Sequence, residues 1–170
     1  MPPTNRRPSR RTAEDFASQV KADLKDAWLP NIYAERIRKM RTRSYTFDGT
    51  PGKSPVEIQH TLLGVELKAG RRRMLCPDLA TARYLSVFAR AGCKRVAVPY
   101  DITRISHLAD QLDSSWHRTL LLADHLTEAA PGNLRSRVRR TLIEKIRAEV
   151  ESAGAGPASP TFKQSTKQRS

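Results

Sequence analysis

The 170-residue chain has few of the side chains that define several common classes of protein. It contains two cysteines and no Cys-x-x-Cys pair, and no two of its four histidines are at metal-ligand spacing. A disulfide framework and a zinc site are therefore not expected. No apolar run approaches the roughly 20 residues that span a bilayer, and the N-terminus lacks the apolar stretch of a signal peptide. We expect a cytoplasmic protein with free thiols and no membrane segment.

Acidic residues are also scarce, since 17 Asp and Glu face 31 Lys and Arg, giving a net charge of +14. Residues 1–11 and 152–170 contain no acid and are rich in proline, serine, glycine and threonine. Such segments cannot bury enough apolar surface to become ordered. The sequence therefore predicts two disordered basic tails on either side of a single domain at residues 12–151.

The basic residues of this domain are concentrated in three clusters. The first cluster consists of Arg36, Arg38, Lys39, Arg41 and Arg43. The second cluster consists of Arg71, Arg72 and Arg73. The third cluster consists of Arg135, Arg137, Arg139, Arg140, Lys145 and Arg147.

Many separate cations favour binding to phosphate, because each one releases counterions from a nucleic acid. We expect the first two clusters and four members of the third, Arg135, Arg137, Arg139 and Arg140, to contact nucleic-acid phosphate, with all three clusters on a common side of the fold. Solvated helix faces remain the alternative interpretation.

Apolar periodicity predicts helices at both ends of the domain. Thr12 and Asp15 resemble a capping box at the start of a helix over residues 12–29. A second helical segment follows Pro30 and carries the first cluster. Two long helices, beginning near residues 101 and 133, are separated by Pro131 and Gly132.

The middle of the chain alternates between extended and helical patterns. Extended segments are predicted over residues 44–47, 56–68 and 71–76. A helix over residues 78–92 is followed by a strand over residues 94–100. This strand–helix–strand order predicts a βαβ unit. The expected fold class is α/β, with a small mixed sheet that contains this unit, N-terminal helices and two long C-terminal helices.

Few segments of the chain carry a recognisable catalytic pattern. The Gly-Thr-Pro-Gly-Lys-Ser run at residues 49–54 lacks the first glycine and the following helix of a phosphate-binding loop. Glu66 and Lys68 remain, because residues two apart in a strand point to the same face. A carboxylate and an ammonium side by side suit metal-assisted hydrolysis of a phosphodiester. A surface pair across two strands is the other interpretation.

The Val-Glu-Leu-Lys sequence at residues 65–68, the basic stretch after it, and the predicted helix and strand up to residue 101 resemble the PD-(D/E)XK nuclease superfamily. They are most similar to the archaeal Holliday junction resolvase branch. The resemblance covers residues 64–101 and implies an αβββαβ core and Mg²⁺-dependent DNA cleavage, often by a dimer. Glu66 and Lys68 would be the catalytic pair.

The family also needs an acidic residue on the strand that precedes this pair. Glu57 is the candidate, which would make Glu57 and Glu66 the Mg²⁺ ligands. Their odd spacing places them on opposite faces of one strand, unless a turn or bulge at Gly64 resets the alternation.

Three functions follow as hypotheses. The favoured one is a basic nucleic-acid-binding protein, for DNA or RNA, with a nuclease-like α/β core. The alternatives are a Mg²⁺-dependent endonuclease that uses Glu66, Lys68 and Glu57, and an assembly factor. An assembly factor would use the C-terminal helices for a protein partner or a homodimer.

Overall fold

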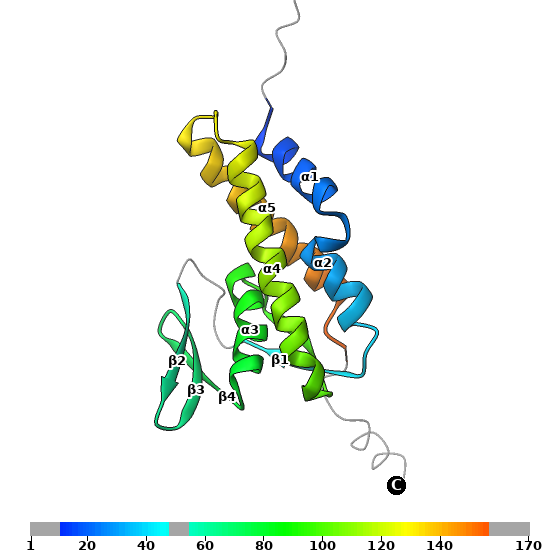
Figure 1. The fold of residues 1–170 in the computed structure, drawn as a ribbon, viewed down its shortest axis with the longest axis vertical. Helices are drawn as coiled ribbons and strands as arrows, with labels where there is room; N and C mark the ends of the chain where they lie inside the picture. Colours follow the sequence, from blue (N-terminus) through cyan, green and yellow to red (C-terminus); the bar gives the residue numbers. More distant parts are fainter. Residues whose placement is uncertain (1–10, 48–54, 157–170) are drawn as a thin grey trace, which may run out of the picture.

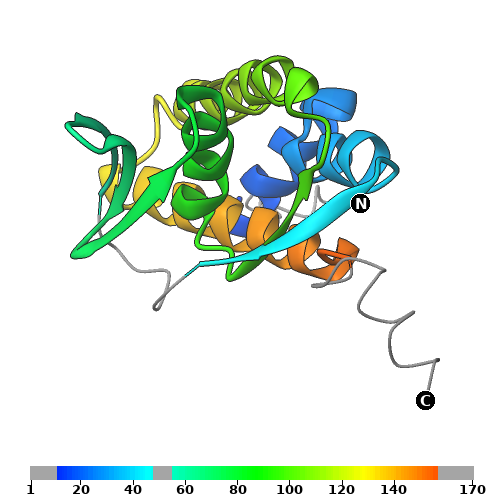
Figure 2. The same ribbon diagram turned by 90° about the horizontal axis from the view of Figure 1, so that it is seen from below.

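The computed structural model describes residues 11–47 and 55–156, which form a helical body with two small antiparallel sheets (Figures 1 and 2). The helical elements are α1 (Ala13–Leu24), the 3₁₀ turn η1 (Lys25–Ala27), α2 (Leu29–Ile32), the π-helical turn η2 (Tyr33–Ile37), α3 (Leu79–Ala91), α4 (Ile102–Leu126) and α5 (Gly132–Ala153). The strands are β1 (Thr42–Thr46), β2 (Val56–Thr61), β3 (Gly64–Ala69), β4 (Arg72–Cys76) and β5 (Arg95–Pro99).

The start of α1 is the capping box that the sequence predicts. The Thr12 hydroxyl accepts a hydrogen bond from the Asp15 backbone N–H at 3.2 Å, and the Thr12 N–H donates to the Asp15 carboxylate at 2.9 Å. These bonds lower the pKa of Asp15. The helix ends at Leu24, earlier than predicted, because Lys25 adopts a left-handed φ of 50°.

The three later helices are also confirmed. Asp78 caps α3, and Gly92 ends it with a φ of 77°, which glycine adopts without strain. The Asp101 carboxylate caps α4, and α4 and α5 run along the long axis of the molecule (Figure 1). Their apolar ladders are buried; that of α5 consists of Val138, Leu142, Ile146 and Val150.

The α/β class is confirmed, but the predicted mixed sheet with a βαβ unit is wrong. β5 pairs antiparallel with β1, whereas β4 belongs to a separate β2–β3–β4 sheet. Two buried tyrosines occupy the second edge of β5. The Ala97 N–H donates to the Tyr33 hydroxyl at 2.9 Å, and the Tyr84 hydroxyl donates to the Ala97 carbonyl at 2.5 Å. Because these hydroxyls satisfy the edge of β5, β4 cannot pair there.

The segment predicted as extended over residues 56–68 is a hairpin. Its two strands meet at Leu62 and Leu63, both highly exposed, and Gly64 follows with a φ of 129°. The sequence allowed either one straight strand or a turn or bulge at Gly64 that resets the alternation of side chains. The structure has the turn. Leu67 is fully buried on the inner face of this sheet.

The core is centred on α3. Phe88 is fully buried and contacts Tyr33 and Tyr84, with ring centroids 5.5 and 5.2 Å apart. The chain remains packed beyond α5, since Tyr33 donates a hydrogen bond to the Gly154 carbonyl at 2.6 Å. Across residues 11–47 and 55–156, no helix combines the length and the apolar composition needed to cross a bilayer.

Candidate nucleic-acid interface

The three basic clusters lie on different parts of the molecule. The first extends from η2 into β1, the second covers the turn before β4 and its first residues, and the third lies on α5. In both views the β2–β4 sheet and α2 lie on opposite sides of α3 and α4 (Figures 1 and 2). The expectation that the clusters gather on one side is therefore wrong, because α3 and α4 pack between the segments that carry the first two.

Half of the third cluster stabilises the fold. Arg139 donates two hydrogen bonds to Asp124, which lowers the pKa of that carboxyl. Lys145 pairs with Glu14 at 2.6 Å, and Arg147 donates to the last carbonyl of α3 at 2.9 Å. The other three arginines of this cluster are exposed. The paired members are held by partners within the fold.

The first cluster is largely free to bind. None of its five cations forms an ion pair within the part of the chain that the structure describes. Lys39, Arg41 and Arg43 are exposed, and Arg41 lies over the Tyr100 ring at 5.0 Å. Arg38 differs, because its Nε donates to the last carbonyl of α5 at 2.9 Å. Arg38 therefore anchors the C-terminal end of α5.

A groove between η2 and α4 adjoins the first cluster. It consists of two hollows of about 630 and 450 Å³ that share Arg36 and Gln111. Nine residues of α4 line it, and five of them recur every three or four positions along one helix face; these five are Arg104, His107, Gln111, Ser114 and Arg118. From Arg104 to Arg118 this face is about 21 Å long, at about 1.5 Å per residue.

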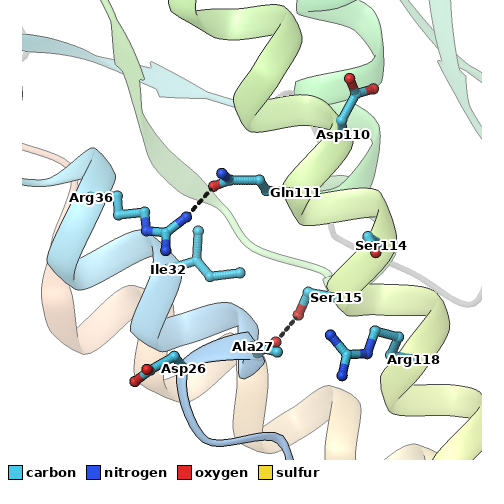
Figure 3. A pocket seen from close by; sticks show the side chains of 9 residues that line it. All are labelled: Asp26, Ala27, Ile32, Arg36, Asp110, Gln111, Ser114, Ser115 and Arg118. Carbon is cyan, nitrogen blue, oxygen red and sulfur yellow. Dashed lines mark hydrogen bonds between the residues drawn. The ribbon is translucent and has the colours of Figure 1, made fainter.

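The charge of the groove is positive. No acidic residue of the described segments lines the larger hollow, whereas Arg36, Lys39 and Arg104 do. The smaller hollow is lined by Arg36 and Arg118 and by two acids, Asp26 and Asp110, whose carboxylates point away from the other lining side chains (Figure 3). One of these carboxylates, Asp110, accepts a hydrogen bond from Arg83 of α3 at 2.7 Å. The groove is therefore suited to an anion.

The hairpin brings the proposed nuclease residues onto one face. Glu57 lies opposite Lys68, and Glu66 lies opposite Gln59 on the neighbouring strand. Glu57 and Glu66 are therefore diagonal neighbours, roughly 7–8 Å apart in such a pair. The Oε2 atom of Glu66 is shielded from solvent and accepts no hydrogen bond from any described residue.

The wider nuclease pattern is present only in part. The chain order is N-terminal helices, four strands (β1–β4), α3 and β5, which is one strand more than αβββαβ, and β5 pairs with β1 and not with the β2–β3–β4 sheet. Within residues 11–47 and 55–156, no three His, Cys, Asp or Glu side chains form a group that could hold a metal ion.

The two cysteines are free, as predicted, and both are buried. Burial raises the pKa of Cys93 to about 12 and also raises that of Cys76. Neither thiol is a nucleophile at neutral pH.

The C-terminal helices present little apolar surface for a partner. Their exposed large apolar side chains are Ile102 and Leu121, which lie about 28 Å apart along α4 at about 1.5 Å per residue. The described part of these helices therefore gives the assembly-factor hypothesis no apolar patch.

Sequence reasoning missed four residues of the groove: Arg104, His107, Gln111 and Arg118. Their regular spacing on one face of a predicted helix is a signal that could have found them. This spacing did not indicate a binding site, because these residues are far apart from the first cluster in the sequence. The groove forms only when η2 packs beside α4.

The comparisons with known proteins give one partial similarity. The chain is 29% identical over 123 residues to a DNA ligase of Rhodopseudomonas palustris (strain BisA53). The match covers 69% of this chain and 17% of the ligase. No family model and no solved structure matches.

Proposed function

We propose that this protein binds nucleic acid through phosphate contacts, mainly at the first cluster and the groove between η2 and α4. The observation that carries this proposal is that no cation of the first cluster forms an ion pair within the described residues, together with the absence of acids along the larger hollow there. The partial similarity to a DNA ligase supports a nucleic-acid partner.

The residue types suit phosphate. A guanidinium presents a fork of donors that matches two phosphate oxygens. Such contacts position the nucleic acid without reading its sequence. Base stacking is limited, because Tyr33, which is close to the first cluster in sequence, is fully buried in the core. The second cluster and the exposed arginines of the third serve as secondary contacts.

Salt dependence tests this proposal. With about five phosphate contacts, affinity for an oligonucleotide should fall at least about 100-fold between about 50 and 200 mM salt. The logarithm of the binding constant should fall linearly with the logarithm of the salt concentration, as measured by fluorescence anisotropy. An absence of binding at low salt, or an affinity that salt leaves unchanged, would contradict the proposal.

A second candidate is Mg²⁺-dependent cleavage of DNA at the hairpin, favoured by the placement of Glu57, Glu66 and Lys68 on one face. Two carboxylates with substrate phosphate are a usual ligand set for Mg²⁺, and the unpartnered Oε2 of Glu66 fits it. When bound, the ion supplies Lewis-acid polarisation of the phosphodiester. Lys68 holds a positive charge beside the carboxylates.

For this candidate we expect Mg²⁺-dependent cleavage of branched DNA that Glu66→Gln abolishes. Glu144→Gln is the matched control, because it removes one exposed carboxylate on α5 and should leave cleavage unchanged. The measurement is gel analysis of labelled junctions. If the unaltered protein cuts no DNA in the presence of Mg²⁺, this candidate is wrong and the binding proposal is unaffected.

A further inference from the structure

A chain of three hydrogen-bonded side chains crosses the groove. Arg36 donates from Nη1 to Oε1 of Gln111 at 2.7 Å, a bond drawn in Figure 3. The Nε2 atom of Gln111 lies 2.9 Å from Nε2 of His107. The chain thus links η2 to two successive turns of α4.

The chemistry of the groups fixes the donor and the acceptor of each bond. A guanidinium only donates, so the Gln111 oxygen must face Arg36. The amide nitrogen of Gln111, which also only donates, then faces His107. Nε2 of His107 therefore accepts this bond, and the imidazole is neutral with its proton on Nδ1.

A protonated His107 cannot keep this arrangement. It carries N–H groups on both ring nitrogens, so Nε2–H would face the amide N–H of Gln111. Turning the amide around would satisfy His107 but would place its nitrogen against the donors of Arg36. A protonated His107 therefore competes with Arg36 for the one acceptor of Gln111, its amide oxygen, and Arg36 loses its bond when that oxygen turns toward His107.

The charges around His107 make an anion the natural partner of its protonated form. Arg104 on its own helix, Arg36 on η2 and Lys39 just after η2 line the same hollow. Of the nearby acids, Asp110 bonds Arg83 of α3, whereas Asp101, the residue before α4, bonds Thr103 and pairs with Arg104 at 3.5 Å. A phosphate in this hollow would therefore face Arg36, Lys39 and Arg104 together with His107.

We propose that Gln111 restrains Arg36 through their hydrogen bond, and that protonation of His107 releases Arg36 to bind a nucleic-acid phosphate in the groove. This inference rests on the proposed function and adds a regulation to the same site. Because linkage is reciprocal, protons strengthen nucleic-acid binding, and nucleic acid strengthens proton binding at His107.

The test is the affinity of the full chain for a labelled single-stranded oligonucleotide at constant ionic strength, from about pH 8 to about pH 5.5. Affinity should rise about fivefold or more as the pH falls. His107→Gln, which cannot titrate, should lose this rise. His117→Gln is the matched control: it removes an exposed histidine of the same helix that lines neither hollow, and should keep the rise.

A second variant tests whether Gln111 restrains Arg36. Gln111→Ala frees Arg36 at every pH, so affinity near pH 8 should increase and the gain on acidification should shrink. If His107→Gln keeps the full rise, or if the unaltered protein binds equally at all pH values, the inference is overturned while the proposed function stands. An absence of binding at every pH would instead contradict the proposed function.

Discussion

Replacing Lys39, Arg41 and Arg43 together with glutamine should lower the affinity for an oligonucleotide about 100-fold near 0.1 M salt. Each of these exposed side chains, unpaired with any acid among the described residues, is expected to contact one phosphate. The salt slope should become shallower by about one unit for each contact removed, and hence by about three. The measurement is fluorescence anisotropy over a series of salt concentrations.

The matched control replaces the exposed arginines of the third cluster, Arg135, Arg137 and Arg140, with glutamine. It also removes three positive charges, but near the N-terminal end of α5. The two variants therefore have the same net charge. We expect this control to lose less than about tenfold in affinity. Equal losses in the two variants would show that total charge, and not the first cluster, governs binding.

The Tyr33→Phe variant should lower the free energy of unfolding by about 2–3 kcal/mol. The Tyr33 hydroxyl is buried, accepts from the Ala97 N–H and donates to the Gly154 carbonyl. Its loss leaves two polar groups without partners at the edge of β5 and after α5. Burial raises the pKa of Tyr33, so this contribution is fully present below about pH 10 and is lost at higher pH. Urea denaturation measures the change.

Tyr100→Phe is the control for this variant. It removes the same hydroxyl from a side chain that is 39% exposed and keeps the ring beneath Arg41. Its stability should change by less than about 0.5 kcal/mol. A Tyr33→Phe protein as stable as this control would contradict the role assigned to the buried hydroxyl.

The parts of the fold that depend on neighbouring residues were predictable from the sequence. The caps at Thr12, Asp78 and Asp101 act within three residues of a helix start, so the sequence contains the whole interaction. The hairpin at Leu62 and Leu63 was harder to predict, because its tip lacks the Asn or Asp that marks tight turns. The partner of β5 was not predictable, since it depends on hydroxyls from Tyr33 and Tyr84.

The same distinction applies to the candidate site. The sequence indicates the first cluster, because its cations are close together along the chain. It could not show that Arg139 and Lys145 are paired, since their partners Asp124 and Glu14 lie 15 and 131 residues away. The sequence could not show the groove either, because the groove forms only when η2 packs beside α4.

The most direct test of the central claim is an NMR map of the backbone amides during titration with an oligonucleotide. Binding at the first cluster and the groove predicts that the largest shifts occur over residues 36–43 and along the α4 face from Arg104 to Arg118. Shifts confined to the β2–β4 sheet, or an equal response over the whole surface, would contradict the claim.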